Sequence, residues 1–421
     1  MNKFFKRLWN DKRGNILVLA GATMPMLIGA AGLATDTVQW TVTKRQLQRA
    51  ADSAAFAGVY ADLQGQTVSD AVAADLGHNN TTGFAIKGGA DIDYPADTAN
   101  WSDAVSVTLT VDRPLSFTSL FLPAPIEISA TGIAAIVPAG EYCVVSLENT
   151  ATTGIDIAGT TDVDLGCGMI TNSTSLDAAV AKGSSTVNAS PIAAVGGIDT
   201  TGNWGDDTEF LPFTVAQKDP FEDVTANPPT SCGNNKLQVN PGQTKTITPA
   251  TDAKDNCYTS MDLKGTVTFE PGVYYISGGD MKINSGAVVN ATGGVTFILT
   301  NVSTGPTATI GNTDWNGTAT ISIESPDTGP YAGIAVYQDR RATDGSGQKP
   351  SINGGSGSYF EGAFYFPGRE LMVNGNAGVT TDCAQFVARR VKFSGTSSVS
   401  NNCDPAGGAQ AFAGQHIRLV G

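Results

Sequence analysis

The sequence predicts a mainly β protein that begins with one long transmembrane α-helix. Three observations lead to this fold class. Residues 14–35 carry no charged side chain and follow a tip with five basic residues. Residues 104–111 (AVSVTLTV) alternate between apolar and polar side chains, the pattern of a half-buried strand. From Glu141 onward, short β-type runs separated by Gly, Asn, Asp and Ser recur without helical patterns between them.

The first element is expected to be a membrane-spanning and extended helix over residues 14–63. Its charge-free part is about 33 Å long at 1.5 Å per residue, close to the thickness of a bilayer's hydrocarbon core. Pro25 is an expected bend point. Beyond Asp36 the helical pattern continues with Val38, Val42, Leu47, Ala50, Ala51, Ala54 and Ala57.

The basic tip, residues 1–13, favours a cytoplasmic N-terminus and an exported C-terminal body. Lys44, Arg45 and Arg49 follow the span and weaken this contrast. We therefore expect a single-pass membrane protein whose body is periplasmic or extracellular. The alternative is a cleaved signal peptide with Gly32-Leu33-Ala34 as its cleavage site, which exports the same body.

Residues 64–138 predict a small α+β unit with its helices packed on a short antiparallel sheet. A helix is expected from Thr67 to Leu76, with Gly77 as its stop. Strands are expected at 84–87, 104–111 and 126–137, and the hydrophobic stretch PLSFTSLFLPAP separates the last two.

Residues 139–405 predict an exported β-rich domain, either a parallel β-helix, which we favour, or a β-sandwich. Within its runs one side of each strand is expected inside, because the apolar residues alternate: Ile155 and Ile157; Val163 and Leu165; Val267 and Phe269; Ile321 and Ile323. Residues 198–262, rich in Pro, Asp and Asn, are expected to be a long loop or insertion. Residues 406–421 are expected to be a C-terminal tail.

Charge and cysteine content restrict the class of protein. The net charge is −14 although the tip is basic, so the body is acidic and nucleic acid is not an expected partner. Six cysteines in an exported body indicate disulfides. Proximity favours three pairs among the 15 possible connectivities: Cys143–Cys167, Cys232–Cys257 and Cys383–Cys403.

The sequence gives weak support to catalysis or to cofactor binding. Asp156, Asp162 and Asp164 are interpreted as outward-facing residues of strands, and the cluster Asp339, Arg340 and Arg341 as surface ion pairs. The sequence has two histidines and no recognised metal-ligand spacing, so we expect neither a metal site nor any cofactor. Strand aromatics are interpreted as core, although a stacking surface for sugars or for a protein partner stays open. These are Trp204, Trp315, Tyr331, Tyr337, Tyr359, Phe364 and Tyr365.

The small face of the first helix, Ala50, Ala54, Ala57 and Gly58, permits close packing. Two interpretations stay open for it. The face can pack against other pilin-like helices, or against the small sheet of its own chain.

The N-terminal sixty residues resemble the TadE/TadG-like family of the tight-adherence (Flp) pilus-assembly system. The residues that carry the resemblance are Lys12-Arg13-Gly14-Asn15, Pro25, Asp36 and the segment QLQRAADSAAFAG at 46–58. The body, with PGVYYISGG and FEGAFYFPG, looks more distantly like the C-terminal regions of some TadG-type proteins. The resemblance implies a component anchored in the inner membrane or associated with the pilus, with an exported domain.

The chain departs from this family in two places. Counting from Asn15, the fifth residue is Leu19, whereas prepilin-like members carry a Glu there. It also lacks the Asp-x-Ser-x-Ser metal motif of many TadG-type proteins.

We therefore expect a non-catalytic component for assembly, anchoring or tip adhesion of a tight-adherence pilus. Its expected partners are the membrane, other pilus-assembly or pilin subunits, and a host or surface ligand. The alternative is a β-helical carbohydrate-binding or carbohydrate-active surface protein with a pilin-type anchor.

Overall fold

The structure is a computed structural model that describes residues 15–79, 85–305, 307–345, 349–353, 355, 357–375, 379–395, 398–401 and 412–421. The chain divides into two compact units. Unit 1 contains the residues up to Val137 together with Ile417–Gly421, and unit 2 contains Pro138–His416.

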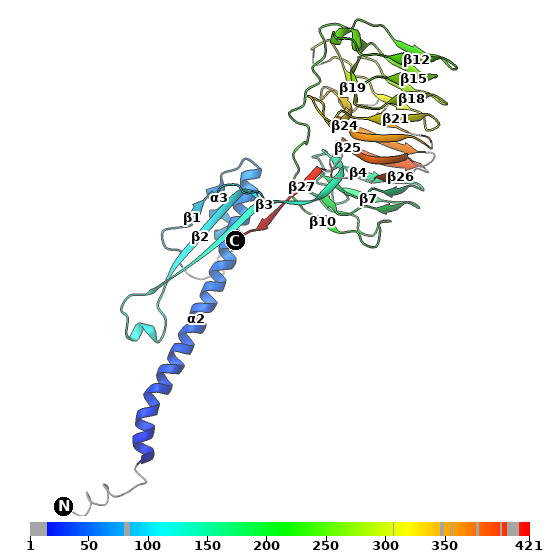
Figure 1. The fold of residues 1–421 in the computed structure, drawn as a ribbon. Helices are drawn as coiled ribbons and strands as arrows, with labels where there is room; N and C mark the ends of the chain where they lie inside the picture. Colours follow the sequence, from blue (N-terminus) through cyan, green and yellow to red (C-terminus); the bar gives the residue numbers. More distant parts are fainter. Residues whose placement is uncertain are drawn as a thin grey trace, which may run out of the picture. The chain divides into compact units, whose positions relative to one another are not determined.

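In its described residues, unit 1 contains two α-helices and a three-stranded antiparallel sheet (Figure 1). The helices are α2 (Asn15–Leu63) and α3 (Val68–His78). The strands are β1 (Asp91–Asp93), β2 (Ser102–Arg113) and the first part of β3 (Ile126–Ser146). The connection between β2 and β3 contains a short 3-10 helix, η2 (Thr118–Leu120).

The alternation in residues 104–111 explains how the sheet packs. Val105, Val107 and Leu109 are at most 1 % exposed, so one face of β2 is covered. A Cβ added at Gly58 of α2 would lie 2.8 Å from Val105 Cγ1, which places this face against α2. The sheet and the small-residue face of α2 thus share one core.

The described part of unit 2 contains strands, most of them short, and one 3-10 helix, η3 (Ala253–Asn256). The strands are β4 (Ile155–Ile157), β5 (Asp162–Asp164), β6 (Gly168–Thr171), β7 (Ala179–Ala181), β8 (Thr186–Asn188), β9 (Ile192–Ala194), β10 (Phe210–Pro212), β11 (Leu237–Val239), β12 (Thr244–Ile247), β13 (Cys257–Tyr258), β14 (Met261–Leu263), β15 (Thr266–Phe269), β16 (Gly272–Ser277), β17 (Met281–Ile283), β18 (Val288–Ala291), β19 (Val295–Thr300), β20 (Thr313–Trp315), β21 (Thr320–Glu324), β22 (Ile334–Gln338), β23 (Ser351–Ile352), β24 (Tyr359–Gly375), β25 (Val379–Gly395) and β26 (Ser398–Asn401). The end of β3 and the start of β27 (Phe412–Leu419) also belong to this unit.

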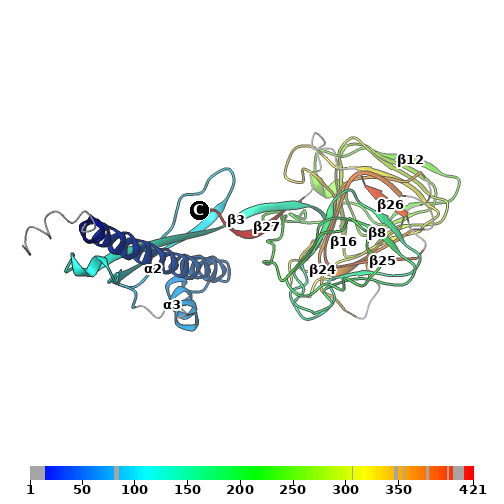
Figure 2. The same cartoon turned by 90° about the horizontal axis from the view of Figure 1, so that it is seen from below.

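The described strands of unit 2 pair in parallel, and most pair with the third strand along the chain. Thus β4 pairs with β7, β5 with β8 and β6 with β9. The same order holds from β11 to β21. Each set of three strands therefore makes one turn around a shared interior, and Figure 2 shows the strands surrounding it.

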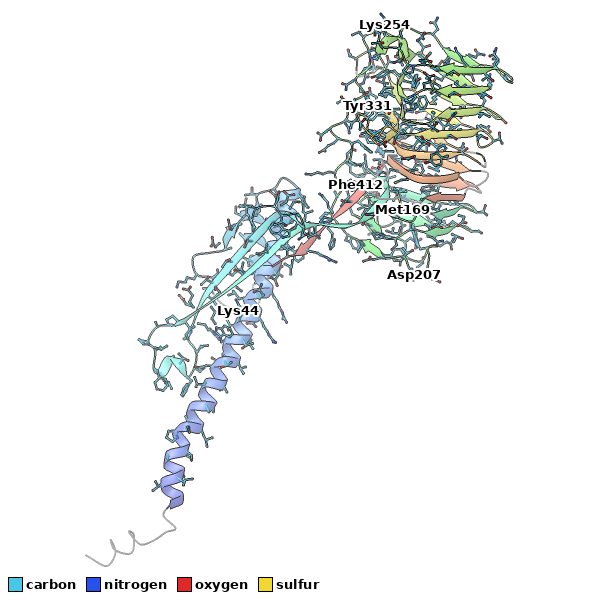
Figure 3. The ribbon with its side chains drawn as sticks, viewed as in Figure 1. Lys44, Met169, Asp207, Lys254, Tyr331 and Phe412 are labelled. Atoms are coloured by element: carbon cyan, nitrogen blue, oxygen red, sulfur yellow. A yellow bond between two sulfur atoms is a disulfide. The ribbon has the colours of Figure 1, made fainter. Side chains whose placement is uncertain are left out.

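The chain enters this stack in its middle. On one side β3 and β4 pair with β6 and β7, and on the other side both pair with β25. The first turns run outward to β10, and the chain then crosses to β11 and coils back until β25 meets β4 (Figure 1). Asp207 and Lys254 lie near the two ends of the stack (Figure 3).

The crossing segment, residues 213–236, contains no named strand, and we call it the strap. The insertion that the sequence predicts over 198–262 is therefore shorter than expected, because β10 to β14 also lie in that range. Low hydrophobicity hides these strands, since β12 (TKTI) buries only Ile247.

Several other expectations differ from the structure. The strand predicted at 84–87 is not found: residues 85–87 form no strand, and Phe84 lies outside the described residues. The strand in this part of the chain is β1, which comes after two glycines with positive φ, Gly88 and Gly89. Helix α3 continues through Gly77 to His78. Part of the predicted tail is strand β27, while residues 406–411 lie outside the described residues.

Inside unit 2 the predicted alternation is confirmed. Ile155, Ile157, Val163, Leu165, Val267, Ile321 and Ile323 are fully buried, and Phe269 is 1 % exposed. The length of the turns varies, however. Ile155 pairs with Ala179, Met261 with Met281, and Met281 with Thr313, so the repeat is 24, 20 and 32 residues. This variation explains why the sequence has no strict period.

Candidate functional site: helix α2 and its docked loop

The N-terminal part of α2 exposes large apolar side chains. Val18, Leu19, Met24, Met26, Leu27, Ile28 and Leu33 are all at least 59 % exposed. This is one helix that is long and apolar enough to cross a membrane, with a mean hydropathy of 1.6 in its most apolar window. Because water disfavours such a surface, a lipid environment fits it better. The helix continues through Pro25, while Arg13 and Gly14 lie outside the described residues.

One stripe of α2 is covered by the rest of unit 1. Asp36, Thr43, Leu47, Ala50 and Ala54 are between 0 and 7 % exposed, and they recur at the three-to-four-residue spacing of one helix face. By contrast Val38 and Val42, which the sequence places in the apolar pattern, are 62 and 49 % exposed. They lie off this stripe, so their apolar character does not serve the core of unit 1.

Asp36 fastens the connection between β2 and β3 to α2. Its carboxylate accepts hydrogen bonds from the backbone N–H of Phe117 at 2.8 Å, and from the N–H and hydroxyl of Thr118, both at 2.6 Å. The N–H groups belong to the start of η2, where a carboxylate satisfies orphan donors. One helix turn further along, Gln39 Nε2 donates to Ser116 Oγ at 2.8 Å. We call residues 114–125 the docked loop.

Small residues allow close approach on the covered stripe. A Cβ added at Gly132 of β3 would lie 2.6 Å from the carbonyl carbon of Ala51, so the strand backbone touches the helix backbone. Ala51, Ala54 and Ala55 are fully buried, and Ala57 is half-buried. Of the two interpretations of the small face, the structure therefore supports packing against the chain's own sheet.

The clustered charges of unit 2 form ion pairs. Asp156 pairs with Lys392 at 2.6 Å, and Asp339 with Arg341 at 2.7 Å. Arg340 pairs with Asp219 of the strap at 2.9 Å rather than with Asp339 or Glu324. Asp162 and Asp164 are exposed on β5, as period-two geometry predicts.

A buried carboxylate, Glu148, lies just after β3 and contacts β25, so it joins the first and the last part of unit 2 along the chain where they meet in the middle of the stack. It is 0 % exposed and accepts hydrogen bonds from Thr150 Oγ1 at 2.7 Å and Arg389 Nε at 3.0 Å. Arg390 Nη1 lies 3.3 Å away and also pairs with Asp344 and Glu370. Burial by itself raises the pKa of Glu148, but the bonds from Thr150 and Arg389 outweigh it and lower that pKa. The carboxylate therefore stays charged and serves as a structural clamp.

The strap is held by tyrosines and one arginine. Tyr331 Oη donates to the carbonyl of Ala226 at 3.0 Å, and Tyr337 Oη to that of Val224 at 2.8 Å. Figure 3 labels Tyr331 at the left of unit 2. Arg340 donates to the carbonyls of Glu222, Phe221 and Val224. Burial raises the pKa of Tyr337 to about 12, so its hydroxyl remains a donor at neutral pH.

The aromatic residues offer little exposed stacking surface. Trp315, Tyr331, Tyr337, Phe364 and Tyr365 are between 0 and 4 % exposed, while Trp204 and Tyr359 are half-buried. Among the described residues there is no cluster of three or more His, Cys, Asp or Glu that could hold a metal ion. His78 is exposed at the end of α3.

Two disulfides of unit 2 have both of their cysteines among the described residues. One joins Cys143 to Cys167 and the other joins Cys232 to Cys257, the pairs that proximity favours. The second fixes the end of the strap to β13. Cys383 is also disulfide-bonded, and Cys403 lies outside the described residues, so the third pairing stays a prediction.

Sequence reasoning missed the docked loop and the strap as parts of the site. A signal for the docked loop was present, since residues 114–126 carry no charge between the charged Arg113 and Glu127. The sequence marks Asp36 as the end of the apolar run and as part of the family pattern, but it does not indicate the contact with the loop, because the partners of Asp36 are 81 and 82 residues away in the chain.

A comparison with known protein families gives a match that covers α2 and the first part of α3. Residues 14–74 match the Tad family model, described as Flp pilus-assembly TadE/G-like. No curated protein gives a significant match to the chain. The matched segment and the single apolar helix are consistent with a single-pass membrane protein. The resemblance seen in the sequence is thus confirmed for its own part of the chain: residues 14–74 are a TadE/G-like module.

Proposed function

We propose that the protein is a single-pass component of the cell envelope that acts in tight-adherence (Flp) pilus assembly. In this proposal α2 anchors the chain in the inner membrane, and unit 2 lies outside the cytoplasm as a non-catalytic structural or adhesive domain at the anchor or tip of the pilus. The observation that carries it is the TadE/G-like module, whose helix leaves its apolar N-terminal part uncovered.

The orientation rests on charge and on disulfides. Five basic residues and one acidic residue precede the apolar run, which favours a cytoplasmic N-terminus. Unit 2 holds the bonds Cys143–Cys167 and Cys232–Cys257, and such bonds persist in oxidising compartments outside the cytoplasm. Both observations support export of unit 2.

For unit 2 we propose a parallel β-helix rather than a β-sandwich. The support is the parallel pairing of each strand with the third strand along, since β-sandwiches are built from antiparallel sheets. A rigid stack of this kind can present a surface at a distance from the membrane.

A non-catalytic role is favoured because most of the candidate groups take part in ion pairs or hold the strap, although Asp162 and Asp164 are exposed on β5. Asp156, Asp339 and Arg341 are in ion pairs, and Arg340 holds the strap. The alternative, a carbohydrate-binding or carbohydrate-active surface protein, needs exposed aromatics or free carboxylates on one face. The burial of most strand aromatics gives this alternative no support.

The test is an in-frame deletion in the source bacterium, complemented with three alleles. The wild-type allele is expected to restore sheared pili and surface attachment. Leu27→Arg places a charge on a side chain that is 67 % exposed within the apolar run, so it is expected to reduce membrane-bound protein and pili. Leu176→Arg, at a residue of unit 2 that is 78 % exposed, is the matched control and should restore both.

Normal piliation in the deletion strain would exclude the pilus role. Release of sugars from a polysaccharide by the purified protein, with piliation unaffected, would favour the carbohydrate alternative.

A further inference from the structure

The docked loop ends in three adjacent apolar side chains that unit 1 leaves uncovered. Leu120 is 74 % exposed, Phe121 is 71 % exposed and Leu122 is 52 % exposed. Three neighbouring side chains of this kind form a continuous apolar tip rather than isolated surface residues. Less than a third of the surface of Leu120 and Phe121 is buried, and about half of that of Leu122, so most of this apolar surface lies outside the core of unit 1.

The position of this tip along α2 is fixed by a series of contacts. Ser116 is bonded to Gln39, and Phe117 and Thr118 are bonded to Asp36. The ring of Phe117 lies against Gly32, where an added Cβ would be 2.2 Å from its Cδ2. The loop therefore runs along α2 toward the N-terminus, over seven residues or about 10 Å of helix.

Phe121 extends this path. Its ring centroid is 5.2 Å from that of Phe117 in an edge-to-face arrangement. Phe117 thus packs on Gly32, and Phe121 packs on Phe117. This row of contacts begins on the last turns of the charge-free part of α2. The neighbouring helix residues Ile28 and Leu33 are 62 and 59 % exposed, so the apolar tip stands beside an apolar helix surface.

The composition of the loop fits the same environment. From Pro114 to Ile126 the chain carries no charged residue. Its η2 donors are satisfied by Asp36, which lowers the cost of bringing this backbone near lipid. The first charges on either side, Arg113 and Glu127, lie on β2 and β3 at the base of the loop.

We propose that Leu120, Phe121 and Leu122 insert into the bilayer surface beside α2 and make a second membrane contact of unit 1. This proposal rests on the membrane span proposed above for α2. A single helix lets a domain rotate and tilt freely, whereas a helix and an adjacent inserted loop define how the sheet of unit 1 stands on the membrane. Asp36 is the residue that couples the two contacts.

The test is photo-crosslinking of the full-length protein in native membranes. The photoreactive residue p-benzoylphenylalanine replaces one residue at a time: Phe121, Leu27 of the apolar run, or Phe213 of unit 2. Phe213 is the matched control, because it is 66 % exposed and Phe121 is 71 % exposed. After irradiation, adducts are identified by mass spectrometry of the purified protein.

The expected result is phospholipid adducts at positions 121 and 27 and at least tenfold fewer at position 213. Lipid adducts at 27 without any at 121 would overturn the loop proposal and leave the span intact. Protein adducts in place of lipid at 121 would also overturn it, because the tip would then contact a partner. Absence of lipid adducts at both 27 and 121 would overturn the span and the loop together.

Discussion

At the scale of single residues, Asp36 is the most informative side chain of unit 1. It lies at the end of the charge-free run, yet it is 3 % exposed and accepts three hydrogen bonds from the docked loop. A buried carboxylate at this depth is tolerated because the donors of η2 compensate for its lost hydration. The residue thus links the end of the charge-free run of α2 to the connection between β2 and β3.

Replacing Asp36 by Ala is expected to free the docked loop. The change leaves the N–H groups of Phe117 and Thr118 without their acceptor and should lower the stability of the loop by about 1–3 kcal/mol. Amide hydrogen exchange of residues 116–122 should become faster. The control is Thr37→Ala, whose hydroxyl bonds only within the helix, to the carbonyl of Leu33 at 2.8 Å. Equal exchange in both variants would contradict the role of Asp36.

A second prediction concerns the small face of α2. Ala54→Glu places a charged side chain at a position that is 0 % exposed against the sheet of unit 1. The variant is therefore expected to misfold, with several-fold less protein in the membrane fraction. Gly77→Ala is the control, since an added Cβ there meets nothing within 4 Å. Normal abundance with lost piliation would instead indicate that the face contacts another subunit.

Glu148 gives unit 2 a predictable response to acid. Its folded pKa lies below the ordinary value of 4.5 because Thr150 and Arg389 hold the charged form against burial. The stabilisation is therefore fully present above pH about 4.5 and is lost as the pH falls toward the folded pKa. The pKa of Glu370, which bonds Lys349 and Arg390, is also lowered and adds to the same loss.

In the variant Glu148→Gln, the loss of stability that protonation of Glu148 causes at low pH should be missing. We expect the variant to be less stable than the wild type by about 1.5–3 kcal/mol at pH 7, and the difference to narrow below pH 4.5. The measurement is chemical denaturation followed at several pH values. Glu141→Gln, at an exposed position, should match the wild type. A constant difference at all pH values would contradict the assignment.

At the scale of elements, the strap determines the order in which the turns of unit 2 follow one another along the chain. It leaves β10 at one end of the stack, passes over Tyr331, Tyr337 and Arg340, and reaches β11 at the other end. Because the Cys232–Cys257 bond holds its far end, the arginine and tyrosines need only fasten its middle.

Arg340→Ala is expected to loosen the middle of the strap without unfolding the stack. It removes four hydrogen bonds to Asp219, Phe221, Glu222 and Val224. Exchange of the amides of Asp219 and of residues 221–224 should quicken at least tenfold, while that of β15 to β19 should not change. Lys218→Ala, an exposed neighbour, serves as the control. Unchanged exchange in the strap would contradict this account.

Elements were predictable wherever one strand or helix carried its own pattern. The strand at 104–111 and the inward residues of β4, β15 and β21 follow from local alternation, and the helix after Thr67 follows from the spacing of its apolar residues. The order of turns was not predictable, because it depends on the pairing of β25 with β4 across 236 residues, such as Val391 with Ile155. The partners of Asp36 were hidden for the same reason.

At the scale of the whole molecule, the two units have different chemistry. Unit 1 exposes apolar helix surface and contains no cysteine, whereas all six cysteines lie in unit 2. A chain that is exported after its anchor should therefore have its thiols oxidised. Alkylation of the denatured, unreduced protein is expected to modify no cysteine, while modification of several would indicate a reducing compartment.

The most direct test of the central claim, a TadE/G-like helix kept as a membrane anchor, is the mass of the mature protein. The protein is extracted from carbonate-washed membranes, and its N-terminal peptide is identified by mass spectrometry. The account predicts that the chain begins at Met1 or Asn2 and that α2 is intact. A chain that begins near Thr35 and is recovered in the soluble fraction would contradict it.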